Sequence, residues 1–200
     1  MKKIIATAAI TAAMTLPVPA SAQAVSLETL LANITAACGA TATLATCDAL
    51  VSQYIAQTAS LPGADRAAAI GRIVVAATSA LQSSAGSDGA VSTEIAQIIG
   101  SATTTLDAVV AADPAAAAAV NSAVSNVTVA VLEVVEARDL QDDAGAAVTV
   151  VAALTDLSDS SSDNNQSGAI DDIAAIIEVG GSVADVIDEI EVISSYASPA

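Results

Sequence analysis

The chain contains no histidine, and its two lysines, Lys2 and Lys3, both lie at the extreme N-terminus. Histidine and lysine are among the commonest general bases, and histidine is also a frequent zinc ligand. The sequence also lacks a Gly-x-Ser-x-Gly motif and a glycine-rich phosphate-binding loop. These absences argue against a hydrolase, a zinc enzyme and a nucleotide-dependent enzyme. We therefore predict a protein that is not an enzyme and that needs no cofactor.

Tryptophan and phenylalanine are absent too, and Tyr54 and Tyr196 are the only aromatic residues. A pair of carboxylates can hydrolyse a glycosidic bond, and acidic residues are plentiful here. However, the chain has no large aromatic ring to form a platform for a sugar. Adjacent acids such as Asp171 and Asp172 would also point in different directions on a helix. A glycosidase is therefore not expected.

Basic residues are scarce throughout the chain. Without residues 1–22, Arg66, Arg72 and Arg138 remain against 22 acids, a net charge of −19. No basic residue follows Arg138, whereas 13 of the 22 acids lie between Asp139 and Glu191. Such a surface repels nucleic acids and anionic lipids. We expect cations or basic proteins to be its partners.

Cys38 and Cys47 are the only cysteines. They lie at the end of one predicted helix and near the start of the next, where a helical hairpin would bring them together. An even cysteine count in an exported protein favours a disulfide, with two buried free thiols as the alternative. Their spacing differs from the Cys-x-x-Cys spacing of redox motifs, so we predict a structural bridge.

The N-terminal residues have the pattern of a signal peptide. Lys2 and Lys3 precede an apolar run, and the small residues at 20–22 match a signal peptidase site. We predict cleavage after Ala22, giving a periplasmic or extracellular protein of bacterial type.

Residues 23–200 are then expected to form one all-α domain, with a more nearly neutral helical core at 23–138 and an acidic C-terminal region at 139–200. The longest uncharged run, 114–132, contains several polar residues and predicts a packed helix, not a transmembrane segment.

Apolar residues recur at steps of three and four along almost all of the remaining chain, which predicts a compact antiparallel bundle of about seven or eight helices. The longest such pattern runs from Val91 to Arg138, and Asp113 and Pro114 divide it as an N-cap and a first helical residue. We expect the two halves to pack on each other as an antiparallel pair. Valine-rich segments at 127–135 and 147–152 also alternate as strands would, although the helical spacing extends further.

The segment 163–174 has features of an EF-hand calcium loop. Potential oxygen ligands stand at positions one, three, five and nine, and Gly168 stands at the position of the required turn. These ligands are Asp163, Asn165, Ser167 and Asp171. Position twelve is Ala174, so the bidentate carboxylate is missing and any affinity for Ca²⁺ should be weak. The alternative is an acidic surface loop, 158–167, followed by a helix.

A second acidic cluster comprises Asp185, Asp188, Glu189 and Glu191. On one predicted helix over 183–193, these acids would repel each other and oppose the helix dipole in its last turns. Screening by salt, divalent cations or a basic partner would relieve this repulsion. A solvated outer face with no further role is the alternative.

Together these features predict an exported, non-catalytic structural or protein-interaction protein with an acidic surface that attracts cations. Self-association or binding to a basic or envelope protein are the expected interactions. The alternative function is weak calcium binding at 163–174 in a secreted protein. No sequence motif selects a particular partner.

Overall fold

Short connections between long amphipathic stretches reverse the chain direction repeatedly. The computed structural model describes residues 27–39 and 44–197, so the predicted signal peptide lies outside the described residues. Within these ranges the chain forms eight α-helices and no strand, which confirms the predicted all-α class. The helices are α1 (Leu27–Gly39), α2 (Leu44–Gln57), α3 (Gly63–Leu81), α4 (Asp88–Ala112), α5 (Ala117–Arg138), α6 (Ala144–Ser160), α7 (Asn164–Glu178) and α8 (Ile187–Ser194).

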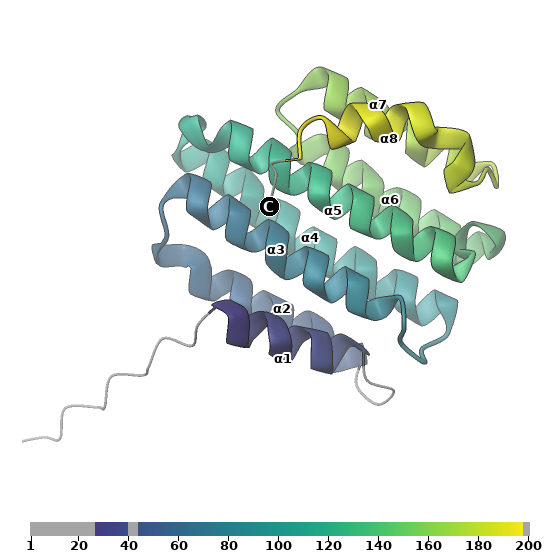
Figure 1. Ribbon diagram of the computed structural model, residues 1–200, viewed down its shortest axis with the longest axis horizontal. Helices are drawn as coiled ribbons and strands as arrows, with labels where there is room; N and C mark the ends of the chain where they lie inside the picture. The colour runs from purple at the N-terminus through teal and green to yellow at the C-terminus, as the bar shows by residue number, and fades with distance from the viewer. Residues whose placement is uncertain (1–26, 40–43, 198–200) are drawn as a thin grey trace, which may run out of the picture.

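The helices form two layers. Helices α1, α3 and α5 lie side by side in one layer, and α2, α4 and α6 lie behind them (Figure 1). Helix α7 packs beside α6, and α8 packs against α7 and α5, so this pair covers one edge of the stack. A continuous apolar core lies between the layers, built from isoleucine, valine, leucine and alanine side chains and the disulfide.

The expected packing of the central helix pair is wrong. Helices α4 and α5 contact each other only slightly, while α4 packs mainly on α6 and α5 mainly on α3. The physical reason is that each helix buries more than one stripe. Helix α5 buries its valine stripe and also Ala123, Ser125, Thr128 and Ala130, and a helix that is buried on several faces needs neighbours on several sides.

The boundary between α4 and α5 forms as expected. Asp113 accepts a hydrogen bond from the Ala115 N–H at 3.2 Å, and Pro114 begins a 3-10 turn, Pro114–Ala116, that leads into α5. Proline is suited to this position because the N–H groups of a first helical turn have no acceptor within the helix. The N–H that proline lacks is therefore not needed there. Both valine-rich segments, 127–135 and 147–152, are helical in the structure, within α5 and α6.

The predicted disulfide is present. Cys38 and Cys47 are bonded, with their Cα atoms 4.9 Å apart, and both are fully buried. The bridge joins the last turn of α1 to the first turns of α2, and the alternative of two free thiols is wrong. By the chain-entropy model, a loop this short adds about 2–3 kcal/mol to the free energy of unfolding.

By length and composition alone, two segments of the described chain have the properties of bilayer-crossing helices, Asp88–Ala112 and Pro114–Arg138. The same criterion is met by core helices of soluble proteins. In this structure both segments occupy the middle of the stack, where α3, α6 and α2 cover them.

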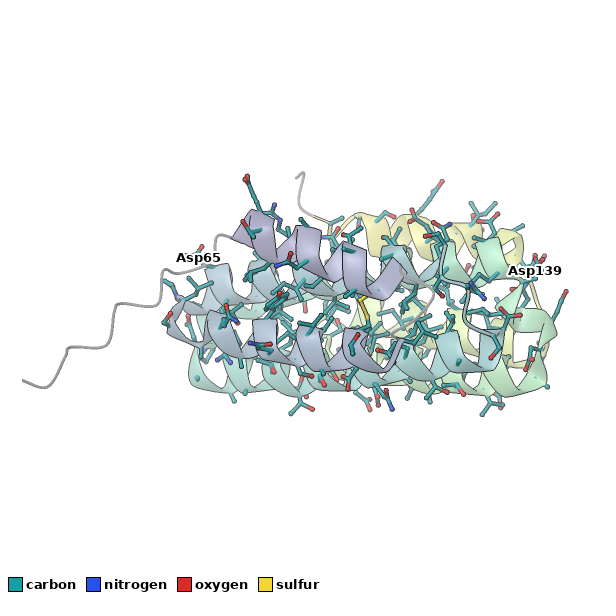
Figure 2. All side chains as sticks on the ribbon, turned by 90° about the horizontal axis from the view of Figure 1, so that it is seen from below. Asp65 and Asp139 are labelled. Carbon is teal, nitrogen blue, oxygen red and sulfur yellow. A yellow bond between two sulfur atoms is a disulfide. The ribbon has the colours of Figure 1, made fainter. Side chains whose placement is uncertain are left out.

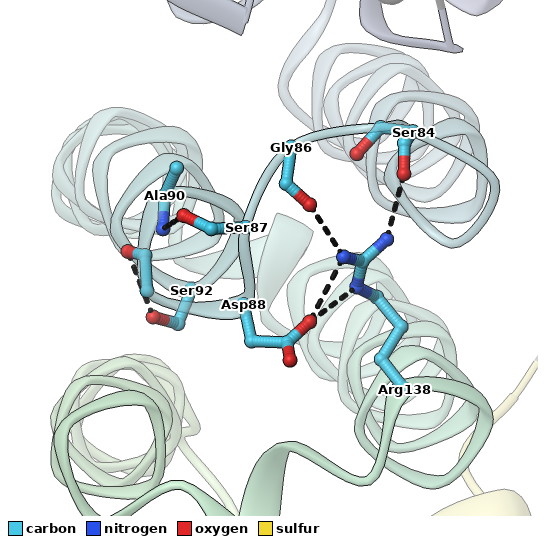
Figure 3. Close-up of polar contacts among 8 residues, drawn as sticks. Ser84, Gly86, Ser87, Asp88, Ala90, Ser92 and Arg138 are labelled. Atoms are coloured by element: carbon cyan, nitrogen blue, oxygen red, sulfur yellow. Dashed lines mark hydrogen bonds and ion pairs between the residues drawn. The ribbon is translucent and has the colours of Figure 1, made fainter.

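Arg138, the last residue of α5, holds the connection between α3 and α4. Its guanidinium donates to the carbonyl oxygens of Ser84 at 2.8 Å and Gly86 at 2.7 Å, and to Asp88 Oδ1 at 2.9 and 3.1 Å (Figure 3). The Arg138 side chain is only 14% exposed. The planar guanidinium carries five N–H donors, so one arginine side chain can bind two carbonyl oxygens and a carboxylate at the same time.

Replacing Arg138 by methionine keeps the aliphatic stem and removes every donor. The free energy of unfolding should fall by about 2–4 kcal/mol, because the Ser84 and Gly86 carbonyls lose their side-chain donor and Asp88 loses its ion pair. Urea denaturation measures this loss. The matched control is Arg72→Met on the exposed face of α3, which should change stability by no more than about 0.5 kcal/mol. Equal losses in the two variants would contradict the assigned role of Arg138.

Helices α3 and α5 approach each other closely at Gly71 and Ala123. A Cβ atom added to Gly71 would lie 2.9 Å from the Ala123 Cβ and 3.1 Å from its Cα, closer than van der Waals contact allows. The pair contacts through small residues, so the two backbones come near enough for the flanking valines and isoleucines to exclude water.

Gly71→Ala should therefore lower the free energy of unfolding by about 1–3 kcal/mol, because the helices must separate to accept the methyl group. Gly168→Ala is the control, since a Cβ at this position in α7 meets nothing within 4 Å. It should raise stability by about 0.5–1 kcal/mol through helix propensity. If Gly71→Ala behaves like Gly168→Ala in urea denaturation, close packing at this point is not a constraint.

Candidate functional site

A polar groove lies between α2 and α4 on the surface of the described chain. The α2–α4 groove has a volume of about 850 Å³. Its lining combines hydroxyl side chains from both helices, the Gln97 amide of α4, two charged residues and several small or apolar residues. The residues that line it are Asp48, Ser52, Ile55, Ala56, Ala59, Arg66, Gln97, Gly100, Ser101, Thr104 and Thr105. Ser52 and Ser101 hydrogen-bond to each other across it at 3.2 Å.

One end of the α2–α4 groove is acidic. Glu94 on α4 is buried, and its carboxylate accepts the backbone N–H of Asp48 on α2. Burial raises the pKa of Glu94 above its ordinary value, and the neighbouring Asp48 charge raises it further, against the lowering effect of that hydrogen bond. Asp48 itself lines the groove and accepts a hydrogen bond from Ser52 at 3.4 Å.

The other end is basic. Arg66, in the first turns of α3, lines the α2–α4 groove together with Ala59 and Thr105. The Arg66 side chain is half-buried, and its Nε is buried without a hydrogen-bond partner among the described residues. A buried donor without an acceptor costs free energy of folding. The position of Arg66 in the helical pattern of α3 does not indicate that its side chain lines a groove.

A second groove, of about 790 Å³, lies across α1, α3 and α5 on the opposite layer. Alanine, glycine and valine make up most of its lining, and Arg72 and Glu133 are its only charged residues. The floor is the close contact of Gly71 with Ala123. This α3–α5 groove follows from the small residues that let the two helices approach.

The segment predicted as a calcium loop is a helix start. Helix α6 continues to Ser160 and α7 begins at Asn164, so the twelve-residue loop at 163–174 and the polar loop at 158–167 are both wrong. Asp163 is the N-cap of α7, and its Oδ1 accepts the N–H groups of Asn165 at 2.9 Å and Gln166 at 3.2 Å. An aspartate followed by a periodic apolar pattern is also the signature of an N-cap, and helix formation prevailed here.

The four predicted metal ligands do not converge. Ser167 and Asp171 follow Asp163 along α7, and Asn165 lies on another side of the helix by its position in the 3.6-residue turn. The Ser167 hydroxyl donates to the Asn164 carbonyl, and Asp171 is exposed. Within the described ranges no three cysteine, aspartate or glutamate side chains are grouped so that they could hold a metal ion.

Asp163 instead connects three parts of the chain. The Tyr196 hydroxyl, after α8, donates to Asp163 Oδ1 at 2.7 Å. This bond lowers the pKa of Asp163, as do the two backbone N–H groups, and the same bond raises the pKa of Tyr196. Nearby, the buried Gln166 side chain donates to the carbonyl of Asn121 on α5 at 2.8 Å. Sequence reasoning missed this junction, because its members lie far apart along the chain.

The second acidic cluster is divided between two elements. A 3-10 helix, Val183–Val186, precedes α8, and Asp185 closes a capping box with Ser182, which lowers the Asp185 pKa. Asp188 and Glu189 lie in the first turn of α8, where the helix dipole favours them. The expectation that these acids oppose the dipole in the last turns is therefore wrong for all but Glu191.

Most acids are exposed and unpaired. Of the 13 between residues 139 and 191, 11 are exposed, and Asp163 and Glu189 are half-buried. Arg138 with Asp88 is the single ion pair in the part of the chain that the structure describes. Figure 2 shows Asp65 and Asp139 at opposite ends of the stack, so negative charge is present at both ends.

Comparison with known proteins identifies no relative: no protein-family model, no curated protein and no solved structure matches this chain. The fold and the chemistry of the residues themselves are therefore the basis for a functional proposal. Among them, the acidic surface at 139–191 and the α2–α4 groove stand out.

Glu94→Gln should stabilise the protein at neutral pH. The amide keeps an acceptor for the Asp48 N–H and removes a buried charge that faces another carboxylate. Because the folded-state pKa of Glu94 is raised, its ionisation costs stability above that pKa and costs nothing below its ordinary value of 4.5. We expect Tm to rise by about 2–4 °C at pH 7 and the difference to disappear as the pH falls below about 4.

Thermal melts followed by circular dichroism over this pH range measure the effect. Glu133→Gln, at an exposed position on α5, is the control and should shift Tm little at any pH. A Glu94→Gln variant that is less stable than the parent at pH 7 would show that the negative charge itself contributes to the α2–α4 contact.

Proposed function

We propose that this chain is an exported, non-catalytic structural or protein-interaction protein whose acidic C-terminal region binds basic segments of partner proteins. The observation that carries this proposal is the exposed acidic surface of α6, α7 and α8. Eleven exposed carboxylates lie in this region, between residues 139 and 191, and no basic residue follows Arg138. No ion pair neutralises any of them among the described residues.

An uncompensated surface of one sign acts on its partners at long range. It accelerates the approach of positively charged segments and weakens as salt screens the charges. A second copy of the chain carries the same net charge, so a basic protein is a better partner than self-association at low salt. Rigid helices hold the carboxylates in place, so binding need not order the acidic surface first.

Two observations of different kind support the proposed compartment. The Cys38–Cys47 disulfide supports an oxidising environment. The N-terminal pattern of residues 1–22 predicts export by a signal peptide. A periplasmic or extracellular location is therefore part of the proposal, and basic proteins of the envelope or of the surrounding matrix are the partner class.

Binding of a lysine-rich peptide to two charge-matched variants tests the proposal. One carries Asp188→Asn, Glu189→Gln and Glu191→Gln in α8, and the other carries Glu28→Gln, Asp65→Asn and Asp107→Asn in the N-terminal half. Five of the six positions are exposed, and Glu189 is half-buried. The α8 variant should lose more affinity than its control, by about threefold to tenfold at low salt, since each charge near a cationic ligand contributes a few tenths of a kcal/mol.

Sodium chloride should weaken binding of the parent protein steadily, as expected for surface charges. Equal affinities of the two triple variants, or binding that salt does not change, would contradict the proposal.

Calcium chloride at matched ionic strength gives a further comparison in thermal melts. If screening alone acts, sodium reproduces the shift; a calcium-specific shift that Asp163→Ala abolishes would favour the weak calcium-binding alternative.

A further inference from the structure

The α3–α5 groove has apolar walls that are only partly covered. Leu31 from α1, Val75 from α3 and Val129 from α5 line it, and all three side chains are half-buried. No other helix of the described chain lies over α3 and α5 on this side of the stack (Figure 1). We propose that the α3–α5 groove binds an amphipathic, basic helix of a partner protein. This inference rests on the function proposed above and names the part of the partner that is recognised.

Carboxylates stand along the rim of the α3–α5 groove. Ser194 lines the groove from α8, and Glu191 precedes it by three residues. On α1, Glu28 precedes the wall residue Leu31 by the same interval. Residues three apart are neighbours on a helix surface, so each carboxylate stands beside a wall residue. Glu133 lines the groove itself, and all three carboxylates are exposed.

The charges of the rim select a cationic occupant. Arg72 is the only basic residue that lines the α3–α5 groove, and neither it nor the three rim carboxylates form an ion pair within the described ranges. Anionic lipid headgroups would be repelled by this rim. A second copy of the chain would bring the same carboxylates to the same place, so self-association through the groove is opposed as well.

The shape of the α3–α5 groove fits a helix. Gly71 and Ala123 bring α3 and α5 close together, so small residues form the floor. Along α5 the lining extends from Ala119 to Glu133, about 21 Å at 1.5 Å per residue, which is the length of a helix of about 14 residues. A helix packs on two neighbours by placing its ridges of side chains into the grooves between theirs. Leucines on one face of the entering helix would cover the half-buried walls, and lysines beside them would meet the rim.

The probe is a peptide of about 14 residues with blocked termini, which presents leucines three or four residues apart on one helical face, lysines on the other and alanine elsewhere. Its comparison has the same composition, with the leucines at alternate positions so that no single helical face is apolar. Calorimetry with the full-length protein should show binding of the amphipathic peptide that is about tenfold tighter or more. Amide chemical shifts should change along α3 and α5.

Asn126→Tyr should block the groove, because Asn126 is exposed and lines it. The phenol ring would occupy the space of the entering leucines, so we expect about tenfold weaker binding of the amphipathic peptide. Asn164→Tyr is the control, since this asparagine is exposed in α7 outside the groove. It should leave the affinity unchanged.

Two charge variants should act in opposite directions. Arg72→Gln removes the only positive charge of the lining and should tighten binding of the lysine-bearing peptide by about twofold to threefold at low salt. Glu133→Gln removes a negative charge and should weaken binding by a similar factor. Weaker binding by Arg72→Gln would overturn the proposal.

The comparison of the two peptides needs no variant, so a variant that fails to fold leaves the test intact. Equal affinities of the two peptides, equal effects of Asn126→Tyr and Asn164→Tyr, or no saturable binding would each overturn the groove as the binding site. If salt and the α8 triple variant still weaken binding of the lysine-rich peptide, the acidic-surface proposal stands and only the groove fails. If Asn126→Tyr weakens binding but salt and charge variants do not, the groove binds an apolar helix, and both the basic partner and the acidic-surface proposal fail.

Discussion

Close packing of helices through small residues is the constraint on which the rest of this structure depends. The chain has no tryptophan or phenylalanine, so its core is filled by isoleucine, valine, leucine and alanine. Such side chains exclude water only when helix axes come near each other. The contact of Gly71 with Ala123 sets this distance for α3 and α5. The α3–α5 groove lies directly over that contact.

Scarcity of positive charge is the second constraint, and each arginine has a distinct place. Arg138 lies within the stack and holds the α3–α4 connection by two carbonyls and Asp88. Arg66 is half-buried at the end of the α2–α4 groove, and Arg72 lines the α3–α5 groove. The exposed acids after residue 138 therefore have no partner within the described part of the chain. With only three arginines against 22 acids beyond the two N-terminal lysines, the surface of the stack is negative.

The EF-hand-like pattern that begins at Asp163 shows why a sequence motif can predict the wrong structure. The pattern from Asp163 to Ala174 satisfies several positions of a calcium loop, yet the same aspartate is a good helix N-cap. The missing carboxylate at Ala174 removes the bidentate ligand, while Ile170, Ile173 and Ile177 are all buried by α7. Burial of these three side chains stabilises a helix over the whole segment, and no loop can place them in the core together.

The sequence alone determined the class of fold, the positions of most helices, the bridge between Cys38 and Cys47 and the stripes that are buried. These properties depend on spacing within about one or two helical turns, so a linear pattern carries them. The tertiary structure alone decided that α4 packs on α6 and not on α5, that Arg66 enters a groove beside Thr105, and that Tyr196 reaches Asp163. Such contacts join residues that are remote in the chain, and they depend on how whole helix faces fit together, which no local spacing specifies.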